Sequence, residues 1–148
     1  MKSSILAIIT ILIICNPIQL PAANIGTIYS NLVQEKEYGT NDCGGYTARV
    51  IKNQAGQMEI YFTSHEGNCG IDGTKAEDVK YDMKKGTLSF NVPFEPSSGK
   101  AYYRFTGRIT NSHLSGKLKL DYLSSPKYNR DETIKLKKTT KKKLFPRK

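Results

Sequence analysis

The chain has 148 residues, a formal net charge of +10, three cysteines and no tryptophan, and its length allows one compact domain. The charge is concentrated at one end, because residues 135–148 carry eight basic side chains and no acidic one. Residues 24–134 carry 14 basic and 13 acidic side chains, so the sequence predicts a nearly neutral domain with a strongly basic tail.

Residues 1–23 have the pattern of a secretory signal peptide. Lys2 gives a positive start, residues 5–14 are apolar apart from one threonine, and Ala22-Ala23 offers small residues for cleavage. The apolar run is shorter than the roughly 20 residues that span a bilayer, which favours cleavage over an uncleaved membrane anchor. A bulky isoleucine precedes Cys15, which disfavours lipoprotein processing. We therefore expect an exported protein, either periplasmic or secreted.

Export would leave two cysteines in the mature chain, Cys43 and Cys69. An even pair in an oxidising compartment predicts a disulfide bond. Closing a loop of 27 residues, counting both ends, would stabilise the fold by roughly 3–4 kcal/mol on the chain-entropy model. Neither a CxxC motif nor a Cys/His ligand spacing occurs, so the sequence predicts no metal site and no cofactor.

The first part of the mature chain has no clear periodicity. We interpret residues 24–43 as an N-terminal arm, although residues 25–40 are also compatible with a short helix or a strand. From Gly44 onward the pattern has period two, which is typical of strands. The first two predicted strands, 46–50 and 58–62, are separated by a turn at 54–56 and place one face of apolar side chains inward: Tyr46, Ala48, Val50, Met58, Ile60 and Phe62.

A long glycine-containing loop is predicted at 64–76, and the clearest hairpin follows it. Residues 79–83 and 88–92 alternate apolar and polar side chains on either side of a Lys-Lys-Gly turn. Residues 93–99 then form a Pro/Ser/Gly loop, and a turn is predicted at 111–113. The remaining predicted strands cover 101–109, 118–122 and 133–136.

About seven short strands with turn signals between them, and no strong helical period, predict an all-β domain. Successive hairpins favour a small antiparallel up-and-down barrel, which also removes exposed strand edges. A β-sandwich is the alternative. We expect the β-barrel domain to occupy residues 44–137 and a basic, flexible tail to occupy residues 138–148.

One stretch resembles a known group of proteins. Residues 105–109 (Phe-Thr-Gly-Arg-Ile) are followed by a turn and by residues 114–118 (Leu-Ser-Gly-Lys-Leu). This pattern resembles the strand-turn-strand repeat of small secreted meander barrels, the calycin-like group that includes lipocalins and avidins. The resemblance implies a β-barrel with glycines at tight bends or bulges. It implies no binding residues, because the chain lacks the tryptophans typical of lipocalins and of the avidin pocket.

The sequence offers no pattern typical of catalysis. Its two histidines, His65 and His113, fall in predicted loops, and neither a glycine-rich phosphate loop nor a GxSxG motif occurs. The acidic residues of segment 72–82 do not match the spacing of a calcium loop. We therefore expect a protein that is not an enzyme and has no catalytic residues.

Several aromatic and basic side chains are out of phase with the apolar positions of their strands. Tyrosine and arginine are enriched at interface hot spots, so an outward-facing group would form a binding patch. Ordinary half-exposed strand tyrosines are the alternative, and a reversed phase would instead place the set in a polar pocket. With one histidine of loop 64–76, the predicted partner-binding residues are Tyr61, His65, Tyr102, Arg104 and Arg108.

The basic tail is predicted to attract polyanions, with a strength that falls as salt screens its field. Outside the cytoplasm, such partners include anionic lipid and polysaccharide. Phe145 is the only aromatic residue of the tail, which argues against specific nucleic-acid recognition. A solvated tail that only aids solubility is the alternative. The predicted polyanion-binding residues are Lys137, Lys138, Lys141, Lys142, Lys143, Arg147 and Lys148.

Together these patterns predict an exported, non-enzymatic binding protein of the cell envelope. Its expected role is partner-binding or inhibitor/immunity-like, with a protein partner in the envelope or secreted fraction. Two alternatives remain open at this point. One is a small-ligand carrier with a pocket inside the barrel, and the other is a cationic envelope-associated factor that acts through its lysine-rich tail.

Overall fold

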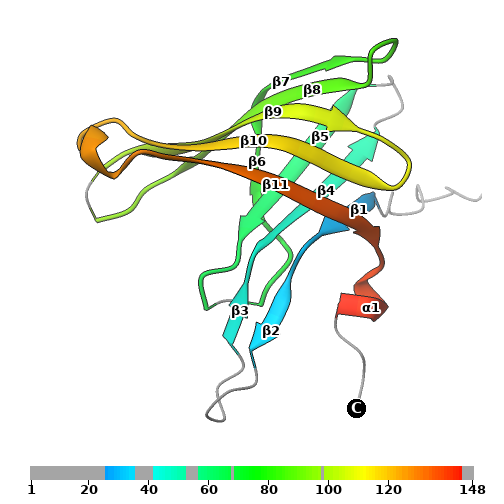
Figure 1. Ribbon diagram of the computed structural model, residues 1–148, viewed down its shortest axis with the longest axis horizontal. Coiled ribbons are helices and arrows are strands. Elements are labelled where there is room, and N and C mark those ends of the chain that lie inside the picture. Colours follow the sequence, from blue (N-terminus) through cyan, green and yellow to red (C-terminus); the bar gives the residue numbers. More distant parts are fainter. Residues whose placement is uncertain (1–25, 36–41, 53–56, 68, 98, 145–148) are drawn as a thin grey trace, which may run out of the picture.

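The structure is a computed structural model that describes residues 26–35, 42–52, 57–67, 69–97 and 99–144 (Figure 1). The predicted signal peptide, the turn at 54–56 and the last four residues lie outside these described residues. Within them the chain forms a nine-stranded sheet and a separate two-stranded sheet. No helix among the described residues has the length and apolar character needed to cross a membrane.

The strands follow one another with short connections along most of the chain. In chain order they are β1 (Thr27–Ser30), β2 (Val33–Glu35), β3 (Asp42–Gly44), β4 (Tyr46–Lys52), β5 (Met58–Ser64), β6 (Thr74–Lys75), β7 (Glu77–Asp82), β8 (Thr87–Phe94), β9 (Ala101–Ile109), β10 (His113–Tyr122) and β11 (Arg130–Thr139). A short 3₁₀ helix, Pro126–Tyr128, joins β10 to β11. A four-residue helix, α1 (Lys141–Leu144), follows β11.

The nine-stranded sheet has the order β6-β5-β4-β1-β11-β10-β9-β8-β7, and each neighbouring pair is antiparallel. Apart from β1, strands that are consecutive in this order are also consecutive in the chain. β1 lies between β4 and β11, so that Tyr29 pairs with Ala48 on one side and with Lys138 on the other. β1 and β11, the first and last strands of this sheet along the chain, are therefore neighbours, which is the connectivity of an up-and-down barrel.

The two ends of this order are joined by the chain itself. β6 pairs with β5 and β7 pairs with β8, and only Ala76 separates β6 from β7. The Ala76 amide donates to the carbonyl oxygen of Ile60 at 2.8 Å, while Glu77 already lies opposite Asn91. The register of β7 shifts between Glu77 and Lys80, as at a β-bulge that bends a strand. The sheet thus forms a nearly closed antiparallel barrel, which confirms the predicted barrel over the sandwich.

The barrel interior is filled by side chains that alternate along the strands, as period two predicts. The Phe62 ring lies 5.6 Å from that of Tyr46, 5.8 Å from Phe90 and 5.7 Å from Tyr103, measured between centroids. Phe90 also stacks on Phe105 at 5.0 Å. These aromatic contacts, together with the buried aliphatic residues around them, form one continuous core.

The boundaries of the barrel differ from those predicted. The predicted arm contains β1, which is a barrel strand. The sequence did not reveal it because Ile28, Tyr29 and Ser30 are all buried, so the period-two pattern is absent there. The predicted tail begins too early, since β11 continues to Thr139 and Lys138 pairs with β1. β8 continues through the proline that was expected to end this strand, and its last residue is the core-facing Phe94.

Candidate binding site

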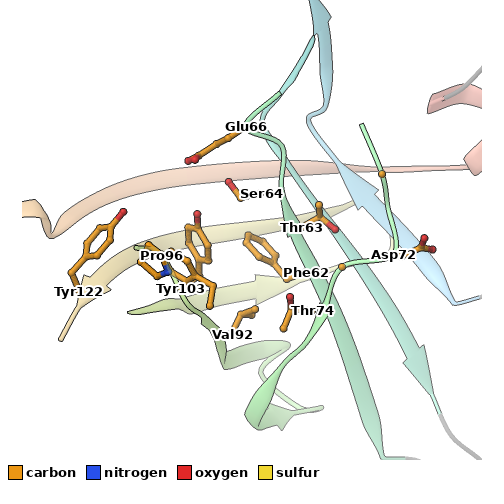
Figure 2. Close-up of a pocket in the computed structure, with 13 residues that line it drawn as sticks. Phe62, Thr63, Ser64, Glu66, Asp72, Thr74, Val92, Pro96, Tyr103 and Tyr122 are labelled. Atoms are coloured by element: carbon orange, nitrogen blue, oxygen red, sulfur yellow. The ribbon is translucent and has the colours of Figure 1, made fainter. Parts of the chain in front are cut away.

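A pocket of about 560 Å³ opens at one end of the barrel (Figure 2). Its walls come from the ends of β5, β8 and β10, the starts of β6 and β9, and the loop between β5 and β6. We call it the mouth pocket, and its lining residues are Phe62, Thr63, Ser64, Glu66, Gly70, Asp72, Gly73, Thr74, Val92, Phe94, Pro96, Tyr103 and Tyr122.

One wall of the mouth pocket is aromatic. The Phe94 and Tyr103 rings are stacked, with centroids 4.6 Å apart, and Tyr122 meets Phe94 edge-on at 6.0 Å. Burial raises the pKa of the Tyr103 phenol, while a hydrogen bond from Ser64 acts in the opposite direction. The phenol is therefore neutral at ordinary pH, and the wall combines rigid apolar surface with hydroxyl groups.

The facing side of the pocket is polar. Ser64, Glu66 and Thr74 lie on the side of the β5–β6 loop, and Asp72 lies farther from the aromatic group (Figure 2). The Glu66 carboxylate forms an exposed ion pair with Arg130 of β11, with 3.5 Å between Oε1 and Nη2. The site can therefore hold an apolar or aromatic group against one wall and offer hydrogen-bond partners on the other.

One lining hydroxyl has no internal partner. Thr63 Oγ1 is buried and forms no hydrogen bond with any residue that the structure describes. A buried hydroxyl without a hydrogen-bond partner is energetically costly.

A disulfide bond anchors the loop that forms the polar side. Cys43 of β3 is bonded to Cys69, as predicted. Next to it, the Gly67 amide donates to the Cys43 carbonyl at 3.0 Å, and the His65 amide donates to the Gly45 carbonyl at 2.8 Å. The loop is thus fixed to the segment that precedes β4, which keeps this side of the mouth pocket in place without a ligand.

A neighbouring hollow of about 480 Å³ is built around Tyr46 and Glu132. The Tyr46 hydroxyl donates to the Glu132 carboxylate, which joins β4 to β11 beyond the end of the short strand β1. Burial and this hydrogen bond raise the pKa of Tyr46. Arg130 and Glu66 also line this hollow, and the two cavities share Ser64 and Glu66.

The structure does not place His65 on an exposed loop surface, where a partner could contact it. Its side chain is 2% exposed, and its Nε2 lies 2.7 Å from Thr47 Oγ1. Thr47 Oγ1 in turn lies 2.7 Å from Ser30 Oγ, which completes a buried polar chain across β1, β4 and the end of β5. The anchored loop buries His65 because the chain folds back onto Gly45 directly after β5.

The other predicted partner-binding residues do not form one patch. On β5, Tyr61 lies beneath the Arg49 guanidinium of β4, 4.5 Å from ring centroid to Cζ. On β9, Arg104 lies 5.0 Å from the Tyr102 ring and forms an ion pair with an aspartate of β10 at 2.8 Å. The strand order places β5 and β9 on different sides of the barrel. Arg108 is exposed near the end of β9 that is remote from the mouth pocket.

The predicted polyanion-binding residues are divided between strand and helix. Lys137 and Lys138 are exposed in β11, and Lys141, Lys142 and Lys143 lie in α1. Arg147 and Lys148 lie outside the described residues. Among the described residues no group of three or more His, Cys, Asp or Glu side chains is arranged to hold a metal ion.

The aromatic residues of the mouth pocket were not singled out from the sequence. Tyr103 and Tyr122 share the core phase of their strands, so the period-two pattern assigns them to the interior, whereas Phe94 was expected in the loop at 93–99. Only their positions at strand ends distinguish them from core residues. That signal is visible once the strand boundaries are known.

Comparisons with known proteins supply no residue roles for this pocket. No protein-family model matches the chain, and neither the curated proteins nor the solved structures give a match. The interpretation of the site therefore depends on its aromatic wall, its polar side and its anchored loop.

Proposed function

We propose that this chain is an exported, non-enzymatic binding protein whose mouth pocket receives a protruding segment of a protein partner. The observation that carries the proposal is the combination of an open cavity of about 560 Å³ with the stacked Phe94–Tyr103 pair on its wall. Tyrosine and phenylalanine at the centre of an interface bury large areas with little loss of side-chain entropy.

The anchored loop supports the same role. A loop that is already fixed by the Cys43–Cys69 disulfide loses little conformational entropy when a partner binds. The disulfide also favours export, because such bonds persist mainly outside the cytoplasm. The expected partner is therefore a protein of the envelope or the secreted fraction, and an inhibitor or immunity role fits a small, rigid domain of this kind.

The alternative of a carrier with an enclosed ligand has less support. The barrel interior is filled by side chains that are at most 2% exposed, namely Ile60, Phe62, Leu88, Phe90 and Phe105. The remaining space lies at the open end, where a partner segment or the end of a ligand could enter. We further propose that the barrel is calycin-like, on the basis of its up-and-down strand order and of the glycine repeat on β9 and β10.

The test is affinity capture from envelope and secreted fractions, followed by a Kd measurement with the captured protein. Phe94→Ala combined with Tyr122→Ala should raise that Kd at least tenfold, because both rings line the cavity. Met83→Ala is the control, since this large apolar side chain is 68% exposed and does not line the mouth pocket. Equal binding by the pocket variant and the control would refute the proposal.

A further inference from the structure

The outer surface of β9, β10 and β11 carries four exposed cations at the end of the barrel remote from the mouth pocket. We call this surface the basic face, and its residues are Arg108, Lys117, Lys135 and Lys137. Each alternates with residues of the core side, such as Leu118 and Leu136, which are at most 1% exposed. The period of two therefore directs all four side chains outward.

The strand register places these cations close together. Arg108 lies opposite Ser115, and Ser115 lies opposite Lys135, so the three form one row across the sheet. Because neighbouring strands are about 4.8 Å apart, the backbones at Arg108 and Lys135 are about 10 Å apart. Lys137 lies two residues further along the same strand, and Lys117 lies two residues beyond Ser115.

No acidic side chain among the described residues forms an ion pair with the basic face, although Asp82, in the row of Arg108, and Asp131, diagonal to Lys117, lie at its margins. Residues 106–118 and 133–148 contain no Asp or Glu, and none of the four cations forms an ion pair with a described residue. The mouth end differs, because Arg104 and Lys119 both pair with Asp121 there. Within the described part of the chain, the four cations of the basic face are therefore without an ion-pair partner, whereas Arg104, Lys119 and Arg130 on the same three strands each have one.

We propose that the basic face binds a linear polymer with repeated phosphate or sulfate groups, laid across β9–β11. Arginine donates two parallel hydrogen bonds to such groups and lysine attracts them as a point charge. The other outward side chains include the small hydroxyls of Thr106, Ser115 and Thr133, which also donate hydrogen bonds to anionic oxygens, and His113, which lies opposite Lys137. The lysines of α1 follow β11 directly and extend the charge.

This composition favours a linear polymer over a lipid bilayer or a nucleic acid. Peripheral membrane binding draws on apolar side chains that enter the lipid, and the outward positions 106, 108, 115, 117, 133, 135 and 137 hold none. Apart from the His113 imidazole, the outward positions of this face hold no aromatic ring on which a base could stack. The proposal is independent of the mouth pocket, which lies at the other end of the barrel.

The experiment measures binding of the whole chain to heparin and to polyphosphate at several salt concentrations. In the face variant, all four cations of the basic face are replaced by glutamine. In the matched control, Lys75, Lys80, Lys100 and Lys127 are replaced, because these are exposed, lie on other elements and change the net charge equally. Circular dichroism melting confirms that each variant is folded.

We expect the face variant to raise the Kd at least tenfold near 0.1 M salt and to reduce its salt dependence. The control should change the Kd by less than about threefold, since it alters only the long-range field. Stronger binding of heparin would identify sulfate groups as the ligand, and stronger binding of polyphosphate would identify phosphate.

Three results would overturn the proposal. The face variant and the control could weaken binding equally, which would mean that net charge alone acts. Replacing Lys141, Lys142 and Lys143 by glutamine could abolish binding while the face variant has no effect, which would assign it to the tail. Finally, the chain could bind phosphatidylglycerol vesicles and neither polymer, which would make a membrane the partner.

Discussion

Gly107 of β9 lies directly opposite Gly116 of β10, and the ring of Phe105 covers both. A Cβ atom added to Gly107 would lie 2.7 Å from the Gly116 Cα and 2.7 Å from the Phe105 Cζ, and would also meet the Ser115 carbonyl oxygen. The two strands therefore approach each other, and the ring, more closely than any residue with a side chain would allow.

Replacing either glycine should destabilise the barrel. Gly107→Ala requires the strands or the Phe105 ring to move, which should lower the free energy of unfolding by about 1–3 kcal/mol. Urea unfolding monitored by tyrosine fluorescence measures this change. Gly44→Ala is the control, because an added Cβ there meets no atom within 4 Å. A similar loss in both variants would contradict the close-approach explanation.

Removal of the disulfide should lower both stability and partner affinity. The variant with Cys43→Ser and Cys69→Ser loses a bond that spans 26 positions of sequence, which corresponds to roughly 3–4 kcal/mol of unfolding free energy. The anchored loop should also become more mobile, so the captured partner should bind more weakly. Calorimetry and a Kd measurement test the two effects separately. A stability loss under about 1 kcal/mol would show that the loop is held by its hydrogen bonds instead.

The filled interior can be tested by making a cavity in it. Phe90→Ala removes a ring that is 1% exposed and contacts Phe62 and Phe105, so the unfolding free energy should fall by about 3–5 kcal/mol. The exposed Tyr128→Ala should change it by less than about 0.5 kcal/mol. Both values follow from chemical denaturation. An unchanged Phe90→Ala variant would mean that this part of the interior is not packed as described.

Stability should fall at alkaline pH because three tyrosines resist ionisation in the folded state. Burial is the main cause that raises the pKa of Tyr29, Tyr46 and Tyr103 above the unfolded value of about 10. The raised pKa makes this contribution fully present below about pH 10, and it is lost as pH rises further. Unfolding measured at pH 9 and at about pH 11 gives the size of the effect.

Tyr46→Phe isolates the largest of these shifts. The variant loses the hydrogen bond to Glu132, which should cost about 1–3 kcal/mol at neutral pH. Its stability should then depend less steeply on pH above about pH 10, because one late-titrating phenol is gone. An unchanged slope would assign the alkaline instability to the other two tyrosines.

Periodicity predicted most of the barrel because its strands have one face inside and one face outside. β4, β5 and β8 follow their predicted alternation, with Ala48, Ile60 and Leu88 among the inward residues. β1 was not recognised, because residues on both of its faces are buried and alternation no longer marks the core side. Its role became visible only from its partners, which lie about 20 and 110 residues away in sequence.

The site was harder to predict than the fold. The alternation of apolar residues correctly predicted that Tyr61, Tyr102 and Arg104 are out of phase with the core. It does not indicate which strands are neighbours across the barrel. The cysteines indicated a bond, but not that the bonded loop would bury His65 and form one side of the mouth pocket. Each of these features depends on contacts between segments that are distant in sequence.

The position of β1 between β4 and β11 also constrains how the chain folds. The strand nearest the start of the barrel finds one of its two partners only in the last strand, so the ring cannot close until nearly the whole chain is present. Contacts of such long sequence separation form slowly, because the loop between them must be ordered first. Until β11 arrives, β1 and β10 each keep an unpaired edge. Chains that lack residues 130–139 should therefore remain open and associate through these edges, whereas the complete chain buries both in a single final step.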